Sequence, residues 1–285
     1  MTLTNKLDPQ GIVRAVDAEV NFNRRTYGAE DLDQSDYLRV TGNDTLRQII
    51  MRARNDGETG DILPLIASCI PDFASCITDF DDFTSLPTAA YTATQATAGT
   101  FALASLAGGV ALADCNSTTA DQGINVQRVA GAFSLAAGVL TYFGCRVKVT
   151  DTIDKCQSFC GLSIIDTTII GSGEITASDF VGFLSDATKL GGVDTGKLDL
   201  EWYDGVAAER ISNAATLVED TWTVLEFVID GVGTIYAYQD GVLTGTATIV
   251  DAPDGVMAPS FVCQSEGTND PILSIDWFRV FQTRH

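Results

Sequence analysis

One stretch in the C-terminal third limits the possible folds of this chain more than any other. Thr221–Ile229 is rich in β-branched and aromatic residues and contains neither glycine nor proline, a composition typical of a strand. Asp230–Gly233 supplies turn residues, and Thr234–Gln239 then predicts a returning strand. Asp240–Gly241 is a strong two-residue hairpin signal, and Val242–Val250 follows it. We therefore predict an antiparallel meander of three strands.

A further strand is predicted at the C-terminus, over Leu273–Gln282. Side chains alternate between the two faces of a strand. Strict alternation places Ile275 and Trp277 on one face, and Phe278 and Val280 on the opposite one.

Many short apolar runs, separated by Gly, Asp, Asn and Thr, fill the chain between residue 98 and the meander. Strands at this spacing, without helical periodicity between them, predict a β-sandwich. The candidate strands are Phe101–Leu106, Gly109–Leu112, Gly123–Arg128, Gly138–Val149, Ser158–Asp166, Gly182–Leu184 and Lys197–Tyr203.

The first part of the chain reads as an extended, partly helical N-terminal arm and linker over residues 1–97, before a β domain over 98–285. Thr45–Gln48 has the form of a capping box, which predicts a helix as far as Arg54. This helix is too short to bury enough surface alone. We expect it to lie on the β domain or on another subunit.

A short repeat follows the predicted helix. Ala67–Phe73 and Ala74–Phe80 are identical at six of seven positions. Two copies interrupted by Pro71 are too few for a coiled coil. The repeat is interpreted as a local duplication of two extended or turn segments, with a docking motif used twice as the alternative.

Charge is divided unevenly along the chain. The net charge is −21, yet residues 1–54 hold eight Lys/Arg and eight Asp/Glu, so 30 acids against 9 bases remain for the rest. An acidic body repels phosphate backbones, which argues against a nucleic-acid partner. Met1–Gln10 lacks an apolar core, so no signal peptide is expected. No membrane span is expected either, because the apolar run Phe101–Ala113 is too short.

The seven cysteines are an odd number with loose spacing, and the only histidine is His285. Cys156 and Cys160 lie four residues apart, which is not zinc-knuckle spacing. We expect reduced, mostly buried thiols, and neither a metal nor a cofactor.

Several motifs, taken in order, resemble the concanavalin A-like, laminin-G-like jelly-roll domain. More narrowly, the chain from residue 98 is similar to versions of this domain in virion structural proteins of tailed bacteriophages. The matching stretches are Gly109–Leu112, Asp121–Gln127, Tyr142–Val149, Phe159–Leu162, Asp179–Phe183, Trp222–Gly241 and Ile275–Val280.

The resemblance implies a capsid decoration or cement subunit on the virion surface, assembled in the host cytoplasm. Its expected partners are the major capsid protein and other copies of itself. Arginine is favoured at interfaces, so six of the arm's arginines are candidates for these contacts, with a solvated helix face as the alternative. They are Arg24, Arg25, Arg39, Arg47, Arg52 and Arg54.

The second function implied by the resemblance is a glycan-binding head fibre or tail appendage. Aromatic rings in strands can stack on sugars, although packing is their commoner use. The candidates are Trp202, Tyr203, Tyr236 and Tyr238.

A glycoside hydrolase is the third possibility, because the same jelly roll hosts glucanases. Asp199 and Glu201 share one face of a predicted strand, about 6.6 Å apart by the rise per residue. The similar glucanases carry a further Glu two positions earlier, where this chain has Lys197. A solvated outer strand face is the commoner role for such alternation. We therefore predict no catalytic residue and no enzyme.

Overall fold

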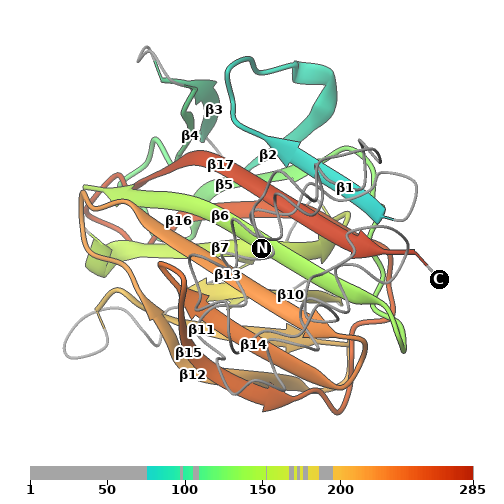
Figure 1. Cartoon of the computed structure of the whole chain (residues 1–285). Coiled ribbons are helices and arrows are strands. Elements are labelled where there is room, and N and C mark those ends of the chain that lie inside the picture. Colours follow the sequence, from blue (N-terminus) through green and yellow to red (C-terminus); the bar gives the residue numbers. More distant parts are fainter. Residues whose placement is uncertain are drawn as a thin grey trace, which may run out of the picture.

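Two antiparallel sheets face each other across one apolar core (Figure 1). The computed structural model describes residues 76–96, 99–104, 109–151, 153–166, 170–171, 174–175, 179–185 and 195–284. The predicted all-β sandwich is confirmed. Short 3-10 turns occur at η2 (Thr88–Ala90) and η3 (Ile153–Lys155), and the small pair of β8 (Ile170–Gly171) and β9 (Glu174–Ile175) stands apart from the two large sheets.

Sheet A contains the predicted meander at one edge. Its order is β15 (Val242–Thr248), β14 (Thr234–Gln239), β13 (Thr223–Asp230), β6 (Leu140–Thr150), β17 (Ile272–Thr283), β4 (Ala111–Asp114) and β3 (Thr100–Leu103), and β1 (Cys76–Asp81) also pairs with β17.

Sheet B lies behind sheet A in Figure 1. Its order is β12 (Ala208–Thr216), β11 (Lys197–Tyr203), β10 (Phe180–Ser185), β7 (Cys156–Ile164), β16 (Met257–Ser265), β5 (Gln122–Arg128) and β2 (Tyr91–Ala96).

The C-terminal strand departs from strict alternation. A register shift in the pairing of β17 with β6 falls between Ile275 and Trp277. An extra residue of this kind reverses the faces of every residue that follows. Ile275 therefore lies in the core together with Phe278 and Val280, while Trp277 does not belong to the core cluster. The prediction that Trp277 shares the face of Ile275 is wrong for this reason.

The sandwich begins earlier than residue 98. β1 pairs with β17 and β2 pairs with β5, so both strands belong to the sheets although they were predicted as arm and linker. β1 contains residues 76–80 of the second copy of the seven-residue repeat, and this part is extended, which agrees with its interpretation as an extended or turn segment. The first copy, the predicted helix ending at Arg54 and the six candidate arginines lie outside the described residues.

The described cysteines are buried in the sandwich, as predicted, and Cys115, Cys145, Cys156, Cys160 and Cys263 are free thiols. The Sγ atom of Cys263 lies 3.3 Å from the Sγ atom of Cys115 and 3.8 Å from the Sγ atom of Cys156. Burial raises the pKa of the Cys145 thiol well above its ordinary value, which keeps it protonated. Cys69 lies outside the described residues. In the described part of the chain no helix has the length and apolar character of a membrane span.

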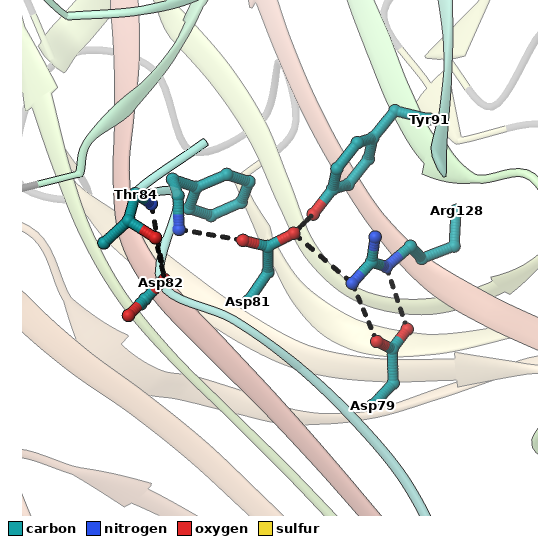
Figure 2. A network of polar contacts seen from close by, with 7 residues as sticks. Asp79, Asp81, Asp82, Thr84, Tyr91 and Arg128 are labelled. Carbon is teal, nitrogen blue, oxygen red and sulfur yellow. Dashed lines mark hydrogen bonds and ion pairs between the residues drawn. The ribbon is translucent and has the colours of Figure 1, made fainter. Parts of the chain in front are cut away.

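An ion-pair network ties β1 of sheet A to β5 of sheet B (Figure 2). Arg128 donates to both oxygens of Asp79, at 3.0 and 2.8 Å, and its Nη2 lies 3.4 Å from Asp81. The Tyr91 hydroxyl donates to Asp81 at 2.6 Å. The pKa of Tyr91 is raised well above its ordinary value, mainly by burial and secondly by this hydrogen bond. The Arg128 guanidinium also stacks on the rings of Tyr91 and Phe278.

Arg128→Met is expected to lower the free energy of unfolding by about 3 kcal/mol, because it leaves two largely buried carboxylates without their cation. Lys148→Met is the matched control. Lys148 Nζ lies 3.9 Å from Asp220 Oδ1, and the Asp220 side chain is 64% exposed. The free energy of unfolding is therefore expected to fall by less than about 1 kcal/mol. Urea unfolding measures both. Equal losses in the two variants would contradict the assigned role of Arg128.

Candidate functional site

The outward face of sheet B carries a set of polar and aromatic side chains that do not belong to the sandwich core. Alternate residues of each strand point away from sheet A. The register brings Ser260, Gly161, Gly182 and Glu201 side by side across β16, β7, β10 and β11. Side chains of this face form an aromatic and acidic part, from β7, β10 and β11, and an amide part, from β5, β7 and β16.

Phe159, Phe180 and Tyr203 form the aromatic part. Phe159 meets Phe180 edge to face at a centroid distance of 5.8 Å, and Phe180 lies 5.9 Å from Tyr203. A Cβ on Gly182 would stand 2.5 Å from the Phe159 ring, so only glycine lets this ring lie against β10. Phe159 and Phe180 are buried, whereas Tyr203 is partly exposed at the end of the series.

The two predicted carboxylates on β11 have different surroundings. Asp199 is 2% exposed and accepts a hydrogen bond from the backbone N–H of Asn213 at 2.7 Å. It also forms an ion pair with Arg210, whose Nη1 lies 3.4 Å from Asp199 Oδ2. Asn213 has a φ of 54°, and the β11–β12 register shifts next to Asp199. Asp199 therefore stabilises a β-bulge, and the prediction of a solvated strand face is wrong for this residue. Glu201 is partly exposed.

Gln127 is the centre of the amide part. Its Nε2 donates to the hydroxyls of Ser163 and Ser260, each at 3.0 Å, and to the carbonyl of Ile164 at 2.9 Å. Its Oε1 accepts the backbone N–H of Asp166 at 3.0 Å. These bonds hold the segment after β7 against β5 and leave Gln127 only 2% exposed.

Two neighbouring amides keep an acceptor without a donor. Asn125 and Gln264 are 6% and 3% exposed, and within the described part of the chain no donor reaches Asn125 Oδ1 or Gln264 Oε1. Buried acceptors normally find a partner, because leaving one unsatisfied costs about 1–3 kcal/mol. The two oxygens are therefore candidate acceptors for hydroxyl or N–H groups of a ligand.

The predicted aromatic candidates do not come together. Trp202 is 1% exposed in the core and donates its indole N–H to Glu209 at 2.8 Å, so its ring has no free face for a sugar. Tyr236 and Tyr238 lie in sheet A, on β14, and both are buried. Only Tyr203 lies on the outward face of sheet B, beside Glu201.

The amide part was missed in the sequence. Its members are Asn125, Gln127, Ser163, Ser260 and Gln264, which come from three strands. The available signal was the polar residues at alternate positions of otherwise apolar strands, such as Asn125 and Gln127 between Ile124 and Val126. Among the described residues, no group of three or more His, Cys, Asp or Glu side chains is arranged to hold a metal ion.

Comparisons with known proteins find no matching family model and no matching curated protein. Solved structures do match. A protein of unknown function from Shewanella oneidensis MR-1 is 16% identical, with a TM-score of 0.52 over 78% of this chain and 93% of that chain. An endo-1,3-beta-glucanase from Streptomyces sioyaensis is 10% identical, with a TM-score of 0.52 over 76% and 99%. The carbohydrate recognition domain of Emp47p is 11% identical, with a TM-score of 0.52 over 75% and 99%.

These likenesses define the class of fold. The chain is a concanavalin A-like jelly-roll sandwich, an architecture shared by hydrolases and by carbohydrate recognition domains. Because one fold carries both activities, function has to be argued from the residues of the site.

Asp199→Ala is expected to lower the free energy of unfolding by about 2 kcal/mol, because the N–H of Asn213 loses a charged acceptor. Glu201→Ala, two residues along the same strand face, is expected to change it by less than about 0.5 kcal/mol. Chemical denaturation of both variants checks the difference. A larger loss for Glu201→Ala would show that the structural roles are reversed.

Proposed function

We propose that this protein is a non-catalytic carbohydrate-binding protein, and that the outward face of sheet B is its binding surface. The single observation that carries the proposal is the pair of buried amide acceptors, Asn125 Oδ1 and Gln264 Oε1, on a face that also presents Tyr203 and Glu201. Sugars offer hydroxyl donors and apolar ring faces. An amide acceptor and an aromatic ring meet those two needs.

The carboxylates support binding over hydrolysis. Acid/base hydrolysis of a glycoside needs two carboxyl groups facing the scissile bond. Asp199 is engaged by Asn213 and Arg210, and Lys197, at the position of the glucanases' additional Glu, donates to Thr216 at 3.2 Å. This leaves Glu201 as the one partly exposed carboxylate of β11. One partly exposed carboxylate can accept hydrogen bonds from a sugar, whereas the hydrolysis described above needs two.

Tyr203→Ala is expected to weaken glycan binding at least about tenfold, because an aromatic stacking contact of roughly 1.5 kcal/mol is lost. Isothermal titration of the full chain with β-1,3- and β-1,3-1,4-glucan oligosaccharides measures the affinity. Phe80→Ala is the matched control, since Phe80 is a 50% exposed aromatic of β1 in the other sheet.

Hydrolysis is tested in the same samples. The parent chain should release no reducing sugar from these glucans. A measurable activity that is lost in Glu201→Gln would replace the binding proposal with a glycosidase.

The second candidate is a virion structural role, in which the protein decorates the capsid of a tailed phage and is exposed on the particle surface. It is supported by the sequence resemblance and by the contrast between a neutral segment at residues 1–54 and an acidic remainder. Such a charge division suits a chain that attaches by one end and keeps its β domain in solvent. A capsid or tail protein that binds glycans would satisfy both candidates.

Replacing the six candidate arginines of the arm with alanine is expected to weaken attachment to a purified phage particle by at least about tenfold, because shell contacts of the usual strength are lost. Co-sedimentation with particles that lack the protein measures the effect, and labelling of intact particles distinguishes capsid from tail. Unchanged co-sedimentation of the variant would rule out the arginines as the attachment surface.

A further inference from the structure

Sheet A carries a second apolar cluster on its outer side, away from the sandwich core. Its members are Leu140, Tyr142, Val228, Tyr236, Tyr238 and Phe281, which we name the tyrosine face. They alternate with core residues along their strands, as Tyr142 does with Phe143 and Val228 with Phe227. Tyr142 stacks on Phe281 at a centroid distance of 5.4 Å, which joins β6 to β17.

The burial of the tyrosine face requires a covering layer. Its six residues are between 0% and 8% exposed, although all of them belong to one sheet. Side chains on the outer side of a sheet cannot bury one another completely, so such a face is normally packed or half solvated. Sheet B cannot supply the cover, because it packs on the opposite side of sheet A (Figure 1).

We propose that residues 1–75 of the same chain dock on the tyrosine face and form its covering layer. Position is the first argument. Cys76, at the start of β1, pairs with Thr283, and the Thr283 hydroxyl accepts the backbone N–H of Leu140 at 2.9 Å. Cys76, to which residues 1–75 are covalently joined, therefore lies at the strand ends that carry Leu140 and Phe281.

Length and composition give the second argument. The other segments outside the described residues contain at most nine residues, and the longest, 186–194, connects two strands of sheet B. Four strands span roughly 15–20 Å, which a loop anchored in the opposite sheet cannot cover. The N-terminal segment has the length, and it is rich in apolar residues around Ile49–Ile50 and Ile62–Ile66.

Charge favours this segment over a second copy of the protein. Whole copies carry a net charge of −21 and repel each other, whereas residues 1–75 carry a net charge of only −4, from eight bases and twelve acids. The tyrosine face also adjoins an acidic group, Glu226, which accepts the Tyr142 hydroxyl at 2.7 Å and is 5% exposed. A Cβ on Gly144 would lie 2.3 Å from the Tyr142 oxygen, so this glycine leaves the space that the pair occupies.

Photo-crosslinking of the full chain tests the proposal. Tyr236→p-benzoylphenylalanine is irradiated, and the products are separated by mass and mapped by peptide mass spectrometry. Crosslinks to peptides of residues 1–75 at monomer mass are expected. The same substitution at Val206, an 82% exposed loop residue, is the control and should give no such link. Links at dimer mass would assign the face to a second copy, and links confined to residues after 75 would also overturn the proposal.

A charge variant gives an independent readout. Val228→Lys places an ammonium group in the tyrosine face, and it should speed tryptic cleavage at the basic residues of positions 1–54 about tenfold, because cleavage follows the population of the undocked state. Val224→Lys, on the same face of β13 but outside the cluster and only partly buried, should leave the rate unchanged. Near-UV circular dichroism confirms that the β domain is intact in both variants. Equal cleavage rates in two folded variants would refute docking at this face.

Discussion

Aromatic contacts across the sandwich are the constraint on which the rest of the structure depends. Phe143 of β6 stacks on Phe227 of β13 at 5.1 Å and reaches Phe261 of β16 at 6.3 Å, and Phe261 in turn packs on Phe278 of β17 at 5.7 Å. These rings set the register of the middle strands in both sheets. Once they point inward, alternation decides which side chains lie on the outer faces, including Tyr203, Gln127 and the tyrosine face.

Local sequence signals were enough to predict those strands in which the residue pattern and the flanking turn residues indicate the same boundaries. Thr234–Gln239 and Lys197–Tyr203 match β14 and β11 residue for residue, because turn residues flank both. β16 was missed, since Pro259 argues against a central strand. In the structure Pro259 lies one residue before the ladder with β5 begins at Ser260, so its missing N–H does not interrupt that ladder. β12 was missed because its exposed, polar sequence at the sheet edge lacks an apolar period.

The bulge in β17 shows a different limit of sequence reasoning. One residue near Asp276 shifts the pairing with β6, and Asp276 forms an ion pair of 2.6 Å with Arg146. The shift exchanges the faces of Trp277 and Phe278, so strict alternation assigns both of them wrongly. A bulge depends on the partner strand, and a pattern within one strand does not contain that information.

The candidate site was predictable only where it lies within one strand. Glu201 and Tyr203 could be selected because they are two residues apart on β11. The contact between Gln127, Ser163 and Ser260 depends on the order of β5, β16 and β7, which residue types alone do not reveal. Asp199 could not be separated from Glu201 by type or spacing. The difference between them comes from the bulge at Asn213.

The two outer faces of the sandwich suit different tasks. The outward side of sheet B combines buried amide acceptors with a partly exposed tyrosine, groups whose chemistry suits a polar ligand. The tyrosine face of sheet A is apolar and nearly fully buried, so exposing it to water would cost about 1.5–3 kcal/mol for each large side chain. A permanent layer on sheet A and an exchangeable ligand on sheet B are therefore compatible, because the core separates them. Under the two proposals, the N-terminal segment would contribute to stability, and ligand recognition would depend on the strands of sheet B.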